Sequence, residues 1–120
     1  IHTPRKNKLS ITPAILEIVE QSGINHDMVI IDHLDSAPLV WTIVNMGYHT
    51  GVTISPAKSK LNDIMEILAQ NEDKLDQVML NSDLALPKID DYKMYIDSTN
   101  DLASIYEITC GQTARNFFEL

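Results

Sequence analysis

The amino-acid sequence predicts an α/β fold built on a parallel sheet, and two observations carry that prediction. Amphipathic helical segments alternate with short apolar runs along the 120 residues, and only a few residues connect them. The run over residues 28–31 reads Met-Val-Ile-Ile. Because it is short and rich in β-branched residues, it favours a strand buried on both faces over a helix. Strand–helix alternation of this kind is typical of a parallel sheet.

The first helix is predicted to begin at Thr12 and to end before Gly23. Thr12 is a favourable N-cap, Pro13 suits the first helical turn, and Gly23 is typical of a helix C-cap. The apolar residues between them recur at helical spacing: Ile15, Leu16, Ile18 and Val19. The strand that follows this helix ends in Asp32 and His33.

The later elements continue the alternation. In chain order they are a helix opened by Ser36 and stopped by Gly47, a strand over 51–54, a helix capped by Ser59, a strand over 77–80, helices over 92–97 and 102–109, and a last helix over 113–118. A further strand would end at His2. An open doubly wound sheet and a closed eight-stranded barrel both satisfy this order, so periodicity does not decide between them.

Composition and charge exclude several classes of function. The chain has 9 Lys and Arg against 17 Asp and Glu, a formal net charge of −8, which argues against a wide contact surface for nucleic acid. No apolar run approaches the roughly 20 residues of a membrane-spanning helix. The single cysteine, Cys110, cannot form an internal disulfide. We therefore expect a cytoplasmic protein that does not associate with membranes.

Three residues able to bind a metal ion follow predicted strands. His2 stands at the start of the chain, His33 ends the first full strand, and Asp83 follows the third. Because the carboxyl ends of parallel strands meet at one edge of the sheet, we expect these side chains to lie close together. Imidazole and carboxylate groups bind divalent ions, so the three residues predict a metal site at this edge.

Several short motifs occur in one order along the chain. They are Ile-His-Thr-Pro at 1–4, Asp-His-Leu-Asp-Ser at 32–36, Met-Gly-Tyr at 46–48, Leu-Asn-Ser-Asp at 80–83, and Thr-Ala-Arg-Asn-Phe-Phe at 113–118. In this order and spacing the sequence resembles the C-terminal half of the TatD-like metal-dependent hydrolases of the amidohydrolase superfamily. The resemblance covers essentially all 120 residues.

The resemblance implies that residues 1–120 form the C-terminal half of one (β/α)8 TIM barrel, with parallel strands that end at about residues 2, 33, 54 and 83. It makes His2, His33 and Asp83 metal ligands, and Asp83 also the catalytic group that takes a proton from water. It implies one or two divalent ions (zinc, manganese or magnesium), which activate water to cleave a phosphoester, ester or amide bond.

Two departures from the family's pattern concern substrate contacts. Asn81-Ser82-Asp83 stands where relatives usually have Glu-Thr-Asp, and Pro4 follows His2-Thr3 where many have Arg. Arg5, in a basic cluster after His2, and Lys58, after the second full strand, are the candidate substrate-binding residues. They suit an anionic group on a small molecule or phosphoester, with nucleic acid considered only as a substrate. The alternative for Arg5 is a solvated loop.

Other polar residues have different expected roles. Asp35 is a candidate to orient an imidazole or, alternatively, to turn the chain into the next helix. His26 and His49 precede predicted strands, which places them at the amino edge of the sheet, where residues usually serve stability.

The chain lacks the His-x-His motif that the family takes from its first strand. We therefore expect these residues to be inactive alone and to need the N-terminal half of their own barrel, another chain, or a second copy in a homo-oligomer. The alternative is a non-catalytic fragment or interaction module whose sheet edges pair with another chain. A lone iron site with two histidines and one carboxylate is a third, less favoured interpretation.

Overall fold

The computed structural model describes residues 1–53, 61–81, 109 and 112–118. The elements in this part of the chain are α1 (Lys8–Ser22), the 3₁₀ helix η1 (His26–Met28), β1 (Ile30–Leu34), α2 (Ala37–Asn45), β2 (His49–Thr53), α3 (Leu61–Ala69), the 3₁₀ helix η2 (Glu72–Gln77), β3 (Val78–Asn81) and α6 (Thr113–Phe118). The predicted helix over 92–97 lies outside the described residues, and so does that over 102–109 apart from Thr109.

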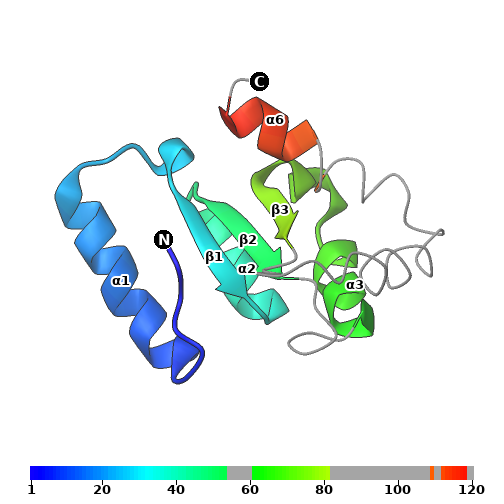
Figure 1. Cartoon of the computed structure of the whole chain (residues 1–120), viewed down its shortest axis with the longest axis horizontal. Coiled ribbons are helices and arrows are strands. Elements are labelled where there is room, and N and C mark those ends of the chain that lie inside the picture. The colour runs from blue at the N-terminus through cyan, green and yellow to red at the C-terminus, as the bar shows by residue number, and fades with distance from the viewer. Residues whose placement is uncertain (54–60, 82–108, 110–111, 119–120) are drawn as a thin grey trace, which may run out of the picture.

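The three strands form a parallel sheet in the order β1-β2-β3 (Figure 1). The first residues of the chain run parallel to β1 on its other side: His2 pairs with Asp32, and the amide of Asp32 donates to the carbonyl of Ile1 at 2.8 Å. The α/β prediction is thus confirmed, and the strand expected to end at His2 is present as a short stretch along β1.

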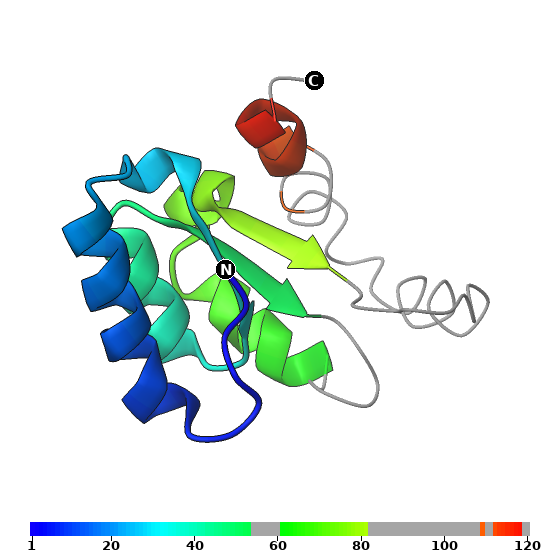
Figure 2. The ribbon, with the colours of Figure 1, turned by 60° about the vertical axis from the view of Figure 1, so that its left-hand side comes forward.

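The helices α1, α2 and α3 share one face of this sheet (Figure 2), because strand order follows chain order. Right-handed crossovers between successive neighbouring strands place each connecting helix on the same side. In Figure 1, α2 lies behind the sheet. Ile31, Val52 and Val78 are completely buried in the core that the strands form with the helices. The site described below lies on the opposite face.

The first helix begins at Lys8, four residues before the predicted N-cap Thr12, so Pro13 lies inside it. Asn7 adopts a left-handed conformation (φ 57°), which asparagine tolerates better than most residues, and its carbonyl accepts the amide protons of Ser10 and Ile11. This turn starts the helix earlier than the sequence pattern indicates. The buried face is formed by Thr12, Leu16 and Val19.

The other boundaries agree closely with the sequence. Gly23 caps α1 with φ 70°, as predicted. Ser36 is the N-cap of α2, and Pro38 occupies its first turn. The strand β2 begins at His49, two residues before its predicted start, and the last helix matches residues 113–118. Among the described residues, none of the helices has the length and apolar character needed to cross a membrane.

Candidate metal centre

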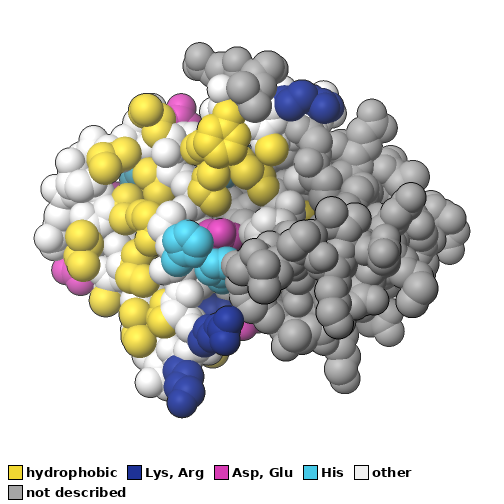
Figure 3. Space-filling model, in the orientation of Figure 1, with side chains coloured by type: hydrophobic (Ala, Val, Ile, Leu, Met, Phe, Trp, Pro, Cys, Tyr) yellow, Lys and Arg dark blue, Asp and Glu magenta, His cyan; other side chains and the backbone are white. Residues whose placement is uncertain are grey.

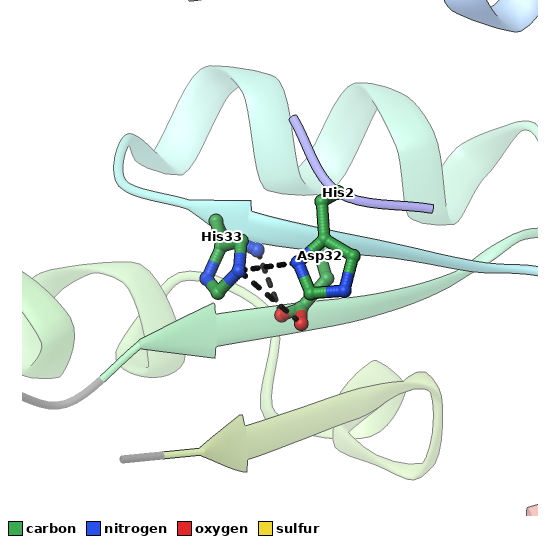
Figure 4. Close-up of side chains that lie close together, drawn as sticks. All are labelled: His2, Asp32 and His33. Carbon is green, nitrogen blue, oxygen red and sulfur yellow. Dashed lines mark hydrogen bonds and ion pairs between the residues drawn. The ribbon is translucent and has the colours of Figure 1, made fainter. Parts of the chain in front are cut away.

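Three side chains with metal-binding groups meet where β1 ends (Figure 4). His2, Asp32 and His33 each offer one ligand atom, and these atoms lie within 4.8 Å of one another. Nδ1 of His2 is 2.6 Å from Nε2 of His33, which is 3.8 Å from Oδ2 of Asp32. His2 is exposed, whereas Asp32 and His33 are half-buried. The cluster is therefore open to solvent on the His2 side.

An irregularity within β1 brings Asp32 and His33 to the same side of the sheet. Successive side chains of a regular strand point to opposite faces, so neighbours do not share a site. The register of β1 against β2 shifts between Ile31 and Leu34, and His33 adopts φ 65°. Left-handed backbone is uncommon for a residue other than glycine, and such strain is typical of functional sites.

Two side chains from the start of the chain hold this strained segment. The hydroxyl of Thr3 donates to the carbonyl of Asp32 at 2.8 Å. The ammonium of Lys8 donates to the carbonyl of His33 and pairs with Oδ2 of Asp35 at 2.7 Å. Asp35 therefore pairs with a lysine. In the described part of the chain no contact between Asp35 and an imidazole supports the expectation that it orients one.

Hydrogen bonds connect the cluster to β2 and β3. Oδ1 of Asp32 accepts the backbone amide proton of His33 at 2.7 Å and the side-chain amide of Asn81 at 2.7 Å. The hydroxyl of Thr53 lies 3.0 Å from Oδ1 of Asn81 and 2.9 Å from Nδ1 of His33. Side chains from all three strands therefore fix the carboxylate and one imidazole.

Glycine at position 51 makes room for this connection. Gly51 lies in the central strand, between Asp32 and Asn81. A methyl group there would overlap Oδ1 of Asp32, lie 2.8 Å from its Cγ and come within 3.2 Å of Nδ2 of Asn81. Because any Cβ would fill this space, only glycine lets the carboxylate of β1 reach the amide of β3.

The structure describes only some of the site residues predicted from the sequence. His2 and His33 are brought together as predicted from the sequence, while Asp83 and Lys58 lie outside the described residues. Arg5 is exposed and lies three residues after His2, and Figure 3 shows basic side chains beside the histidines. Sequence reasoning missed Asp32 as a candidate ligand. In a regular strand its side chain would lie on the opposite face of the sheet from that of its neighbour His33.

The donor set suits a divalent metal ion. Two imidazole nitrogens and one carboxylate oxygen are ligand types that zinc and related ions bind. At 2.6 Å the two ring nitrogens are at hydrogen-bonding distance, so one of them carries a proton in the metal-free protein. Because a ligand binds through a lone pair, metal binding by both nitrogens would require that proton to move to the other nitrogen of its ring or to leave.

The amino edge of the sheet carries the other two histidines, in different surroundings. Glu20 lies 2.9 Å from the hydroxyl of Tyr48 and 3.2 Å from Nε2 of His26. Burial, together with the bond to Glu20, raises the pKa of Tyr48 to about 12. Burial lowers the pKa of His49, whose ring meets Phe117 edge-on at 4.8 Å.

A cavity of about 640 Å³ also lies at this amino edge. It is bordered by η1, His49, Asp76 and α6, so it is separate from the cluster of His2, Asp32 and His33. No triad of metal-ligating side chains within bonding reach of one another is found there among the described residues. Among the described residues, the candidate metal site therefore lies at the carboxyl edge.

Comparison with known proteins gives one informative similarity. Over 130 aligned residues the chain is 28% identical to a protein of Methanocaldococcus jannaschii described as an uncharacterized metal-dependent hydrolase. The match covers all of this chain but 48% of that protein, so the chain spans about half the length of its curated relative. No family model and no solved structure matches the chain. The chain is thus distantly similar, over its whole length, to half of a metal-dependent hydrolase.

Proposed function

We propose that this chain is the C-terminal half of a TatD-like (β/α)8 barrel and that the intact protein is a metal-dependent hydrolase. The observation that carries the proposal is the convergence of His2, Asp32 and His33 at the carboxyl edge of a parallel sheet. This is the edge where α/β enzymes place their reactive groups. The similarity to half of a metal-dependent hydrolase supports it.

The sheet topology favours a barrel over a doubly wound sheet. Residues 1–3, β1, β2 and β3 lie side by side in chain order. A doubly wound sheet reverses its strand order at a switch point and carries helices on both faces. In the described residues the order does not reverse, as expected of successive barrel units.

An apolar stripe on α1 supports the proposal that a further part of the barrel is required. Ile11, Ile15 and Ile18 recur at helical spacing beside the buried face, and Ile18 remains 68% exposed. In the described part of the chain, the short stretch at residues 1–3 pairs with β1 on one side only. The preceding strand and helix of a barrel would cover both features, whether they come from the same polypeptide or a second copy.

The residues of the site suggest how the reaction would proceed. His2, His33 and Asp32 would hold the ion, and their imidazole groups favour zinc over magnesium, which prefers oxygen ligands. A bound divalent ion acts as a Lewis acid and lowers the pKa of water to about 7. Asp83 would accept the proton of the attacking water, and Arg5 would contact an anionic substrate group. The bond cleaved would be a phosphoester, ester or amide.

Metal content and hydrolysis in variants test the proposal. We expect His2→Ala and His33→Ala to lower metal affinity by at least about a hundredfold and to abolish hydrolysis, because each removes a ligand. His26→Ala, at the other edge of the sheet, is the matched control and should retain metal. Full metal occupancy and activity in both site variants would overturn the proposal.

The exposed edge and stripe also favour a second candidate, a non-catalytic module that pairs with another chain. The mass and N-terminal sequence of the native protein discriminate between the two. A longer polypeptide with a His-x-His motif upstream favours the hydrolase. A native protein limited to these residues, with metal bound and no hydrolysis, favours the module.

A further inference from the structure

The hydrogen bonds behind His33 have one consistent direction, which begins at Asp32. An ionised carboxylate only accepts hydrogen bonds. Asn81 must therefore present its NH2 group to Oδ1 of Asp32, 2.7 Å away. The reversed amide would place two acceptor oxygens against each other at that distance. The carbonyl oxygen of Asn81 thus faces the hydroxyl of Thr53.

The next link fixes the role of Thr53. Its hydroxyl has a single proton, and Oδ1 of Asn81, 3.0 Å away, can only accept it. Towards Nδ1 of His33, at 2.9 Å, the same hydroxyl can therefore act only as an acceptor. Nδ1 of His33 must then carry the proton.

A neutral imidazole that is protonated on Nδ1 keeps its lone pair on Nε2. Nε2 is the nitrogen of His33 that faces His2 and the carboxylate of Asp32. We propose that Thr53 and Asn81 are positioning residues that hold His33 in the Nδ1–H form, so that Nε2 is presented as a metal ligand. This inference rests on the metal centre of the proposed function. Thr53 and Asn81 themselves do not bind the metal.

The surroundings keep this arrangement rigid. Thr53 is only 3% exposed, and Asn81 is half-buried in the neighbouring strand, opposite Thr53 in the β2–β3 register. Gly51 leaves the space through which Asn81 reaches Asp32. The hydrogen bonds that start at Asp32 thus run through β3 and β2 and return to the ring of His33, which lies on the same strand as Asp32.

Thr53→Val tests the inference because it keeps the shape of the side chain and removes the acceptor. Nitrogen NMR of the metal-free protein, at a mildly alkaline pH where imidazoles are neutral, reports which ring nitrogen of His33 is protonated. We expect Nδ1–H in the wild type and a mixture of both forms in Thr53→Val. Zinc affinity should fall by about tenfold to a hundredfold, as for other residues that orient a ligand.

Two variants separate positioning from general destabilisation. Thr53→Ser keeps the hydroxyl and should restore both the Nδ1–H form and the zinc affinity. Thr50→Val removes a buried hydroxyl from the same strand that faces the carbonyl of Gln77 instead, so it should change neither. A wild-type His33 protonated on Nε2, or equal zinc affinities for Thr53→Val and Thr50→Val, would overturn the inference.

The same measurements distinguish this inference from the proposed function. Failure of the wild-type protein to bind any divalent metal would overturn the proposed function and the ligand role of His33 with it. Metal binding with His33 held as Nε2–H would overturn the positioning role of Thr53 and Asn81 alone.

Discussion

The two edges of the sheet each carry two histidines and nearby carboxylates, yet they use them differently. At the carboxyl edge, ring nitrogens of His2 and His33 face each other at 2.6 Å beside Asp32. At the amino edge, His26 stacks on Tyr48 with ring centroids 4.3 Å apart, and Nδ1 bonds the carbonyl of Met46 at 2.8 Å. Position relative to the strand ends thus separates a candidate metal site from structural contacts.

The role of each histidine therefore depends more on the partners of its ring nitrogens than on the residue types that surround it. At the amino edge, Nδ1 of His26 contacts the carbonyl oxygen of Met46, and Nε2 contacts the carboxylate of Glu20. At the carboxyl edge, one nitrogen of His33 is held by Thr53 and the other faces further ligand atoms. We therefore expect substitutions at the two edges to affect different properties: metal affinity at one and stability at the other.

The largest effect is expected from Gly51→Ala. The added methyl would overlap Oδ1 of Asp32 and force the carboxylate away from Asn81. Overpacking of this kind costs about 1–3 kcal/mol of unfolding free energy. Because the same shift removes the support of His33, zinc affinity should fall as well. Urea unfolding and zinc titration measure the two losses.

A double variant shows whether the clash itself is the cause. Asp32→Ala removes the group that the methyl meets, so Gly51→Ala should cost less in that background than in the wild type. Additive losses in the double variant would contradict this explanation of the glycine. Gly23→Ala, at the end of α1, has no atoms within 4 Å of the added methyl and should leave zinc affinity unchanged.

A smaller effect on stability, with none on metal, is expected at the amino edge from Tyr48→Phe. The ring of Tyr48 is fully buried and its hydroxyl donates to Glu20, which is half exposed. Loss of such a bond costs about 1–2 kcal/mol, between the values for neutral and charged partners. Urea unfolding should detect the loss, whereas zinc titration should match the wild type. Weakened zinc binding would contradict the separation of the two edges.

The raised pKa of Tyr48 adds an alkaline signature to that variant. Above about pH 10 an unfolded tyrosine loses its proton, while Tyr48 in the fold keeps it up to about 12. The unfolded state then binds fewer protons than the folded state, so stability falls as pH rises through this window. Tyr48→Phe should remove this part of the decline. Identical alkaline slopes in both proteins would contradict the assignment.

The sequence predicted the features that depend on chain order. Parallel strands that follow each other in sequence end at one edge, so the meeting of His2 with His33 could be expected from their positions. The same rule placed His26 and His49 at the other edge. These predictions needed only the position of each residue relative to a strand, which apolar periodicity supplies.

The sequence did not predict the features that depend on irregular backbone. Alternation along β1 places Asp32 and His33 on opposite faces, and the left-handed φ of His33 reverses that expectation. Lys8 lies in the basic cluster after His2, and its bond to the carbonyl of His33 could not be expected from the sequence. Tertiary contacts stabilise the left-handed conformation of His33, and no local pattern of residues predicts these contacts.

The smallest effect is expected at His49, whose substitution should change the pH dependence of stability. Burial lowers the pKa of His49 below the ordinary value of 6.5, while Asp76 and Asp27 raise it to a lesser degree. Nδ1 is buried without a hydrogen-bond partner among the described residues, so protonation would create a buried N–H with no acceptor. The fold therefore favours the neutral ring.

The sign of the pH dependence follows from this preference. Below about pH 6.5 the unfolded chain takes up a proton at His49 that the folded chain refuses, so stability falls as pH decreases towards the lowered pKa. His49→Gln should lose less stability over this range. The contact with Phe117 is lost at every pH and shifts the whole curve, so the difference in slope, measured by urea unfolding, isolates the titration. Parallel curves would contradict the lowered pKa of His49.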